Sequence, residues 1–340
     1  MFDFSQSLNL PLIWGFIIAA AIFFYVLLDG FDLGLGIIFP FAPTEKCRNK
    51  MMNSIAPFWD GNETWLVLGG GVLFAAFPLA YSILLPAFYI PIILMLLGLI
   101  MRGVAFEFRF KEEGKARRLW DYFFHLGSII AALCQGLILG AFVQGIKVDG
   151  VNYGGGVFDF FTNFSVMTAI AVVFGYCLLG STWLIMKTEG ETQIFARKIT
   201  FISLTFVAIF MALVSIFMPI LNERIRTLWF TEPNIYYLLP IPLVTAALFL
   251  ILWFRVNKNN HEYLPFLISV ALFFLGYLGI AISLYPWIIP FQYDIYQCAA
   301  ANTSLSLLLV AVVPMLPIIL VYTGYCYYLF RGKTQHENLY

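Results

Sequence analysis

The chain has 340 residues, of which 61% are hydrophobic, 18% are aromatic and 11% are charged. Soluble domains carry about 25% charged residues, so this composition excludes a soluble globular protein and indicates one embedded in membrane lipid. Lysine plus arginine and aspartate plus glutamate each number 19, and a chain with no basic excess is not expected to bind nucleic acid.

Nine apolar stretches are long enough to cross a bilayer, which takes about 20 residues of helix. No Lys or Arg precedes the first stretch and no cleavage pattern follows it, so we expect a retained span and not a signal peptide. A tight turn near Leu84–Pro86 should separate the second stretch from the third. The linkers leave no room for a soluble domain, so residues 1–340 are expected to form a single polytopic membrane domain. The stretches predict transmembrane helices over residues 10–38, 62–82, 85–105, 119–144, 157–186, 199–221, 235–254, 263–289 and 303–330.

The basic residues between these stretches predict the orientation of the chain. If the nine spans alternate in direction, 16 of the 19 basic residues fall on one side of the membrane, the basic side. The other side receives only Lys147, Arg224 and Arg226. The positive-inside rule makes the basic side cytoplasmic, with the N-terminus periplasmic and the C-terminus cytoplasmic. The basic side carries Lys46, Arg48, Lys50, Arg102, Arg109, Lys111, Lys115, Arg117, Arg118, Lys187, Arg197, Lys198, Arg255, Lys258, Arg331 and Lys333.

Two acids lie inside the first predicted span, in the segment DGFDLGLG. Asp29 and Asp32 are three residues apart and share a helix face, with Cβ atoms about 5–6 Å apart. Two such carboxylates in a medium of low dielectric cannot easily both ionise, so the pair is suited to taking up and releasing a proton. The alternative is that they only orient the helix. The glycines Gly30, Gly34 and Gly36 predict close helix packing.

A second polar cluster begins the next span, in APFWDGNETWL. Asp60 and Glu63 have the spacing of a helix N-terminal cap, which would explain them without any function. They also lie at the depth of Asp32, so they could belong to one proton-conducting group. Trp59 and Trp65 are interpreted first as members of an interfacial aromatic belt.

The third cluster, MRGVAFEFR, places Arg102 at the cytoplasmic mouth of the third span. A buried Arg102 needs an anionic partner, and Asp29, Asp32 and Asp60 are the nearest in depth. Glu107, Arg109 and the charges up to residue 118 are interpreted as a solvated face. The acids thus gather at one face of the membrane, as a proton inlet from the cytoplasm would require.

Redox ligands are scarce. Of the three histidines only His125 lies near a span, and the five cysteines are scattered without a CxxC pair. Haem chemistry in a membrane needs several such ligands inside the bundle. We therefore expect no haem ligand, no metal site and no catalytic residue in this chain.

The segments 29–36, 53–66 and 102–109, in this order and spacing, resemble subunit II of bacterial cytochrome bd-type quinol oxidases, including the cyanide-insensitive branch. The likeness continues to LPIILVYTGYCYYLF at 316–330. It implies an all-α fold of two four-helix bundles plus a peripheral helix. It also implies a bacterial cytoplasmic (inner) membrane location and a partner, subunit I, that carries haems b and d and oxidises quinol with oxygen. A small single-span third subunit and a structural quinone on this chain are further partners that the resemblance raises.

Within the resemblance, Asp29, Asp32 and Asp60 match family carboxylates on a cytoplasmic proton pathway, and Arg102 matches the family arginine. Trp65 matches a tryptophan near a proposed oxygen entrance, whereas Glu63 stands where relatives can have glutamine. An independent proton-coupled transporter is the alternative function, and a purely structural subunit, in which Asp29, Asp32 and Asp60 are dispensable, is a third. Acids at one membrane face and no inverted repeat disfavour the transporter.

Overall fold

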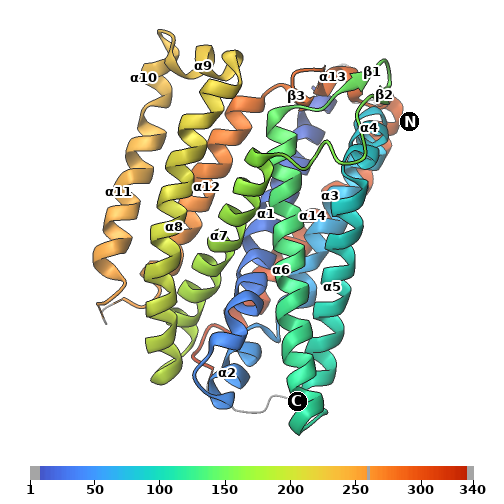
Figure 1. Ribbon diagram of the computed structural model, residues 1–340. Helices are drawn as coiled ribbons and strands as arrows, with labels where there is room; N and C mark the ends of the chain where they lie inside the picture. The colour runs from blue at the N-terminus through green and yellow to red at the C-terminus, as the bar shows by residue number, and fades with distance from the viewer. Residues whose placement is uncertain (1–7, 259–260, 335–340) are drawn as a thin grey trace.

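The computed structural model describes residues 8–258 and 261–334, which leaves both chain ends and His336 outside the described part. The described chain is almost entirely helical (Figure 1). Two short antiparallel hairpins pair β1 (Val148–Asp149) with β2 (Asn152–Tyr153) and β3 (Trp287–Ile289) with β4 (Tyr293–Asp294). The helices are α1 (Leu10–Ile38), a 3-10 turn (Phe39–Phe41), α2 (Glu45–Ile55), α3 (Trp59–Ala76), α4 (Pro78–Ala87), α5 (Tyr89–Arg109), α6 (Gly114–Gln144), α7 (Asn163–Lys187), α8 (Glu191–Leu221), α9 (Glu223–Phe230), α10 (Asn234–Leu238), α11 (Pro240–Arg255), α12 (Leu264–Leu284), α13 (Ile295–Cys298) and α14 (Asn302–Leu329).

Eight helical segments of the described chain are long and apolar enough to cross a membrane: α1, α5, α6, α7, α8, α10 with α11, α12 and α14. The one predicted span outside this group, 62–82, is the second in chain order. It is divided between α3 and α4, and the helical path is broken between them at Phe77. It is less apolar than the others because the first turns of α3 hold Asp60, Asn62 and Glu63.

The turn predicted near Leu84–Pro86 is wrong by a few residues. Pro86 lies inside α4, and the chain turns at Phe88 instead. The helix after the turn begins at Tyr89, with Pro91 in its first turn. A missing N–H is tolerated there, because the first amides of a helix have no intrahelical acceptor.

The helices form two groups of four. Helices α1, α3, α5 and α6 pack as one group and α7, α8, α11 and α12 as the other, with α7 lying against both α1 and α6 (Figure 1). Helix α14 packs outside the first group, against α1 and α3. The predicted all-α architecture of two four-helix bundles and a peripheral helix is confirmed.

Glycines let α1 approach both α6 of its own group and α7 of the other group closely. A Cβ added to Gly34 would collide with the backbone carbonyl of Tyr176 in α7, and one added to Gly36 would collide with Ser128 of α6. Gly180 of α7 reciprocates, since its Cβ would lie 2.7 Å from the amide nitrogen of Leu35. The close packing predicted for this glycine stripe is therefore confirmed.

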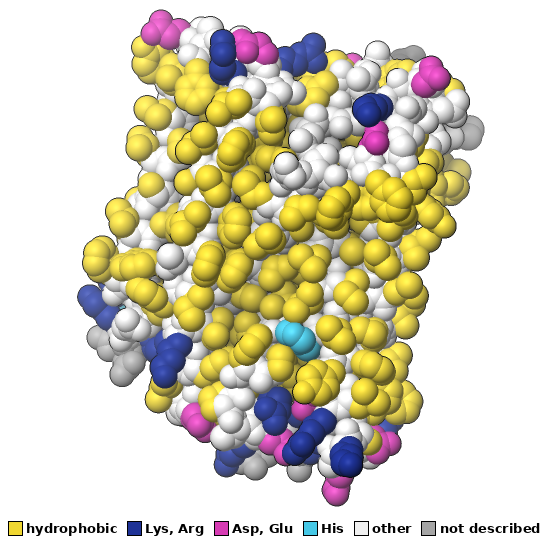
Figure 2. All heavy atoms as spheres, viewed as in Figure 1, with side chains coloured by type: hydrophobic (Ala, Val, Ile, Leu, Met, Phe, Trp, Pro, Cys, Tyr) yellow, Lys and Arg dark blue, Asp and Glu magenta, His cyan; other side chains and the backbone are white. Residues whose placement is uncertain are grey.

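Charged and apolar side chains separate along the bundle (Figure 2). Hydrophobic side chains cover the middle of the visible face, and most of its lysines and arginines lie at the lower end, with α2. We call this end, formed by α2 and the α5–α6 and α7–α8 turns, the basic end. The two hairpins lie at the opposite end.

Candidate functional site

Three charged side chains from three helices meet inside the first bundle. Arg102 of α5 donates a hydrogen bond of 2.7 Å from Nη1 to Asp29 Oδ1 of α1, and both side chains are 1% exposed. The Nη2 of the same guanidinium lies 3.0 Å from Glu63 Oε1 of α3, whose side chain is 26% exposed. We call Asp29, Glu63 and Arg102 the acid–arginine cluster. Asp29 is thus the anionic partner expected for Arg102, and Glu63 is a second one.

Exposure decreases steadily along this group toward the interior. Asp60, one turn before Glu63 on α3, is exposed. Glu63 is partly covered, and Asp29 lies about 14 Å from the end of α1 at Ile38, given nine intervening rises of about 1.5 Å. Glu63 interacts electrostatically with Asp60, Arg102 and Asp29. The four residues therefore interact in sequence from the exposed Asp60 to the buried Asp29.

Asp32 belongs to a neighbouring hydrogen-bonded chain and not to the acid–arginine cluster itself. Its Oδ2 accepts a hydrogen bond of 2.7 Å from Asn62 Nδ2, which also donates to the carbonyl of Leu28 at 3.3 Å. Tyr327 of α14 donates from its hydroxyl to Asn62 Oδ1 at 2.9 Å. The chain Asp32–Asn62–Tyr327 thereby ties α1, α3 and α14 together. The sequence offered Asn62 as part of a polar turn, but nothing marked Tyr327.

Carboxyl groups outnumber basic groups in this region. One arginine faces the carboxyl groups of Asp29, Asp32 and Glu63, and Asp29 and Asp32 are fully buried. Among the described residues, Asp29 Oδ2 and Asp32 Oδ1 are buried without a hydrogen-bond partner. An uncompensated charge in such a place costs several kcal/mol, roughly. The one arginine therefore cannot neutralise all three carboxyl groups, and the region is suited to holding a proton.

The cap predicted from Asp60 and Glu63 does not form, which is a correction. Phe58, after Pro57, occupies the N-cap of α3, and no side chain caps it. Asp60 instead lies in the first turn, where an acid is favoured by the partial positive charge of the helix N-terminus.

The interpretation of Trp65 as part of an interfacial belt is also wrong for this chain. Its side chain is 3% exposed, and its ring centroid lies 4.7 Å from that of Phe24 on α1. Helix α3 turns Trp65 toward α1 because it follows the buried Asn62 by three residues. Trp59 is half-buried, against Phe106 at 5.2 Å.

The prediction of a solvated face around Arg109 is wrong as well. Arg109 is fully buried, donates to Asp121 at 2.5 Å and to Asn49 at 2.9 Å, and stands over the ring of Phe39 at 5.1 Å. Helix α2 and the start of α6 fold over it, which a linear charge pattern does not reveal. Glu107 is exposed, as predicted.

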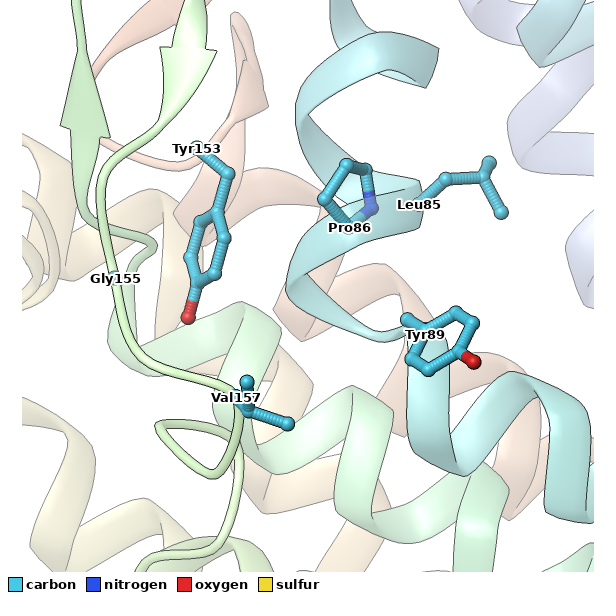
Figure 3. A pocket seen from close by; sticks show the side chains of 6 residues that line it. All are labelled: Leu85, Pro86, Tyr89, Tyr153, Gly155 and Val157. Atoms are coloured by element: carbon cyan, nitrogen blue, oxygen red, sulfur yellow. The ribbon is translucent and has the colours of Figure 1, made fainter.

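An apolar hollow of about 500 Å³ lies at the other end of the bundle (Figure 3). Tyr153 and Val157 line one side of it and Leu85, Pro86 and Tyr89 the other. It contains none of the predicted site residues.

Comparison with known proteins agrees with this architecture. The family model described as cytochrome bd terminal oxidase subunit II matches residues 10–330. The chain is 27% identical to cytochrome bd-I ubiquinol oxidase subunit 2 of Escherichia coli (strain K12), over 97% of this chain and 96% of that protein. It is 29% identical to cytochrome bd ubiquinol oxidase subunit 2 of Bacillus subtilis (strain 168), over 96% and 97%. Its fold is similar to that of the bd oxidase from Geobacillus thermodenitrificans, with a TM-score of 0.66 at 10% identity, covering 95% of this chain and 98% of that one. The chain therefore belongs to the cytochrome bd terminal oxidase subunit II family.

Proposed function

We propose that this chain is the non-haem subunit of a quinol:oxygen oxidoreductase and that it carries cytoplasmic protons toward the oxygen-reducing site. The observation that carries the proposal is the decrease in exposure from Asp60 through Glu63 to the Arg102–Asp29 pair. Reduction of oxygen to water consumes one proton for each electron delivered by quinol. An oxidase buried in a membrane therefore needs a polar route for protons.

The acid–arginine cluster is suited to be the inner end of that inlet. Asp60 is accessible for proton capture, and Glu63 lies between it and Arg102. Arg102 stabilises an ionised carboxylate beside it, because a fixed cation within hydrogen-bond distance favours the charged form. A proton reaching Glu63 weakens its bond to the guanidinium, which then holds Asp29 alone. The carboxyl groups of Asp60, Glu63 and Asp29 thus bind the proton and pass it on, and Arg102 stays charged throughout.

We assign the haems of the complex to the partner subunit I, where they supply the redox chemistry. His125, the histidine of this chain that lies in a membrane helix, does not fit a haem in the bundle. It contacts the carbonyl of Gly36 at 3.1 Å and stands edge-on to Phe41, which is 66% exposed. His125 therefore lies at the outside of the bundle.

Exposed small residues on α3 support a contact between this helix and the partner subunit. Asp60 and Gly71 are exposed on one side of α3, and a Cβ added to Gly71 would meet nothing within 4 Å. Small residues let membrane helices approach closely, and an exposed acid is costly against lipid. Subunit I seated on this side would cover Asp60 and receive protons from α3. Buried Trp65, which packs against Phe24 of α1, would give oxygen an apolar approach inside the bundle.

The test measures turnover and proton uptake per haem in the purified complex carrying Glu63→Gln or Asp60→Asn. Each amide keeps the size of the side chain and removes the titratable proton. Loss of a proton-transfer group typically lowers rates by about 10²–10⁴-fold, and water can bypass part of that loss. We expect Glu63→Gln to slow oxygen reduction while haem content stays normal.

Glu107→Gln is the matched control, because Glu107 is an exposed acid at the same end of the bundle. It should leave turnover unchanged. Normal turnover in Asp60→Asn, Glu63→Gln and Asp29→Asn alike would show that the acids are structural. Substrate movement by this chain alone in vesicles would favour the transporter alternative.

A further inference from the structure

A chain of hydrogen-bonded side chains lies deeper in the bundle than the acid–arginine cluster. Gln135 of α6 donates from Nε2 to the hydroxyl oxygen of Tyr25 on α1 at 2.8 Å. Tyr176 of α7 donates from its hydroxyl to Gln135 Oε1 at 2.5 Å. Tyr25 is 4% exposed and Tyr176 is 1% exposed. Three helices of two bundles thus each contribute one polar group to a site otherwise lined by apolar residues.

This chain continues the path that begins at Asp60. Tyr25 precedes Asp29 by one helical turn, so the two side chains lie on the same face of α1, with Cβ atoms about 5–6 Å apart. Both Tyr25 and Tyr176 interact electrostatically with Asp29. Tyr25 lies about 20 Å along the axis from the end of α1, near the middle of a hydrocarbon core about 30 Å thick.

The local packing sets the orientation of these groups. A Cβ added to Gly30 would lie 2.7 Å from a ring carbon of Tyr176, so the glycine makes room for that ring beside α1. The Tyr176 hydroxyl in turn fixes the oxygen of the Gln135 amide and turns its nitrogen toward Tyr25. The Tyr25 oxygen accepts from Gln135 and keeps its own proton and one lone pair free.

Buried polar atoms of Asp29 and Trp65 lie on the two sides of the Tyr25 hydroxyl group. Asp29 Oδ2, buried on the side of the basic end, has no hydrogen-bond partner among the described residues. Trp65 packs against Tyr25 on the side of α3, and its indole N–H is likewise buried and without a partner among them. Buried polar atoms that lack protein partners are usually satisfied by water, so Tyr25 stands between two places where a water would be held.

We propose that Tyr25 passes protons from Asp29 into the middle of the membrane, and that Gln135 and Tyr176 position its hydroxyl. Asp29, once protonated, gives its proton to the free lone pair of the phenol oxygen, and the phenol gives its own proton to a water molecule on the Trp65 side, because the indole N–H is only a donor. Tyr25 is neutral before and after the transfer, and rotation of the O–H bond resets it. This proposal rests on the proton-conducting function proposed above and names its inner limb.

The test compares Tyr25→Phe with Tyr277→Phe in the intact purified complex. Each change removes one phenol hydroxyl that is hydrogen-bonded next to α1. Tyr25 belongs to α1 and accepts from Gln135, and Tyr277 donates to the carbonyl of Ala19 in α1 at 2.7 Å. Only Tyr25 lies on the proposed path. We expect Tyr25→Phe to lower turnover per haem by at least about ten-fold, toward the lower end of losses for proton-transfer groups. Tyr277→Phe should keep normal turnover, and both should keep normal haem content.

A second readout needs no turnover. The infrared difference spectrum of the resting complex between two pH values reports carboxyl groups that gain a proton. Removing the Tyr25 hydroxyl should shift a carboxyl band that Asp29→Asn abolishes, and Tyr277→Phe should leave this band in place. Tyr176→Phe should produce a smaller turnover loss than Tyr25→Phe, because it frees Gln135 without removing the relay.

The outcomes separate this proposal from the one on which it rests. If Glu63→Gln slows turnover but Tyr25→Phe leaves turnover and the carboxyl band unchanged, the relay is wrong and the inlet stands. If Tyr25→Phe and Tyr176→Phe lower haem content equally, with normal turnover per remaining haem, the three residues only clamp the bundles and the relay is also wrong. If neither Glu63→Gln nor Tyr25→Phe slows turnover, both proposals fail.

Discussion

Arg102 of α5 and Asp29 of α1, 73 residues apart in the chain, form a 2.7 Å ion pair with both side chains 1% exposed. Buried pairs of this kind add little net stability, because desolvation offsets attraction. Breaking one by removing a single partner is costly, because an unpaired charge is left in the interior. The two members of the pair differ in their other partners. Among the described residues, Arg102 has Glu63 as a second anion, whereas Asp29 has no cation except Arg102.

This asymmetry predicts unequal effects of the two single substitutions. Arg102→Met should destabilise the complex by about 3–5 kcal/mol, since it leaves Asp29 unpaired. Asp29→Asn should cost less, because Arg102 keeps Glu63. Thermal unfolding and haem-to-protein ratio in purified complexes measure both. The double variant should recover part of the stability lost in Arg102→Met, and a double variant less stable than either single would contradict the pairing.

Asn62 should behave as the centre of a three-residue network. Asn62→Leu removes the donor to Asp32 and the acceptor of Tyr327 together, at a cost of about 1–3 kcal/mol for buried groups left unsatisfied. Tyr327→Phe breaks only one of these bonds. A double-mutant cycle on unfolding temperature should show that the two losses are not additive. Strict additivity would mean that Tyr327 does not act through Asn62.

The tail after α14 should loosen in acid. Lys333 pairs with Glu262 in the α11–α12 loop and donates to the carbonyl of Thr188 at 3.0 Å. Burial alone would raise the pKa of Glu262, but hydrogen bonds from Lys333 and Gln193 outweigh it and lower that pKa. A lowered folded pKa means that the stabilisation is present at neutral pH and is lost as the pH falls through that pKa.

The amide of Thr334, which donates to the carbonyl of Lys187 at 2.8 Å, reports on this docking. Its hydrogen-exchange protection, corrected for the intrinsic rate at each pH, should decrease in acid. The pair is partly exposed, so its contribution is about 0.2–1 kcal/mol. In Glu262→Gln the Thr334 amide should be as weakly protected at every pH as it is in the wild type in acid. Glu189→Gln, which changes a nearby exposed acid, should match the wild type.

The distribution of basic residues predicts the direction of insertion. A reporter active only in the cytoplasm should work when fused after Tyr340, and a periplasmic reporter there should not, because 16 of the 19 basic residues lie on the predicted cytoplasmic side. A fusion in the loop near Lys147 should give the opposite result. Activity of the periplasmic reporter after Tyr340 would mean that a span has been miscounted.

The sequence by itself determined the class of the protein and the outline of its site. Spans could be found because a bilayer imposes about 20 apolar residues on each helix, a local property of the chain. Asp29, Asp32, Glu63 and Arg102 stood out because charge inside a span is costly wherever the helix packs. The glycine stripe at Gly34 and Gly36 likewise predicted the close contacts that α1 makes.

Only the tertiary structure decided which of these residues meet. Helix rotation and packing turn Asp29 toward Arg102 and Asp32 toward Asn62, although both acids lie on one face of α1. Trp65 and Arg109 look like surface residues in the sequence and are buried, because α1 covers the first and α2 with α6 covers the second. Tyr25, Gln135 and Tyr176 come from three helices and share no spacing. Their hydrogen bonds depend on long-range packing, because no local pattern records which faces of α1, α6 and α7 will touch.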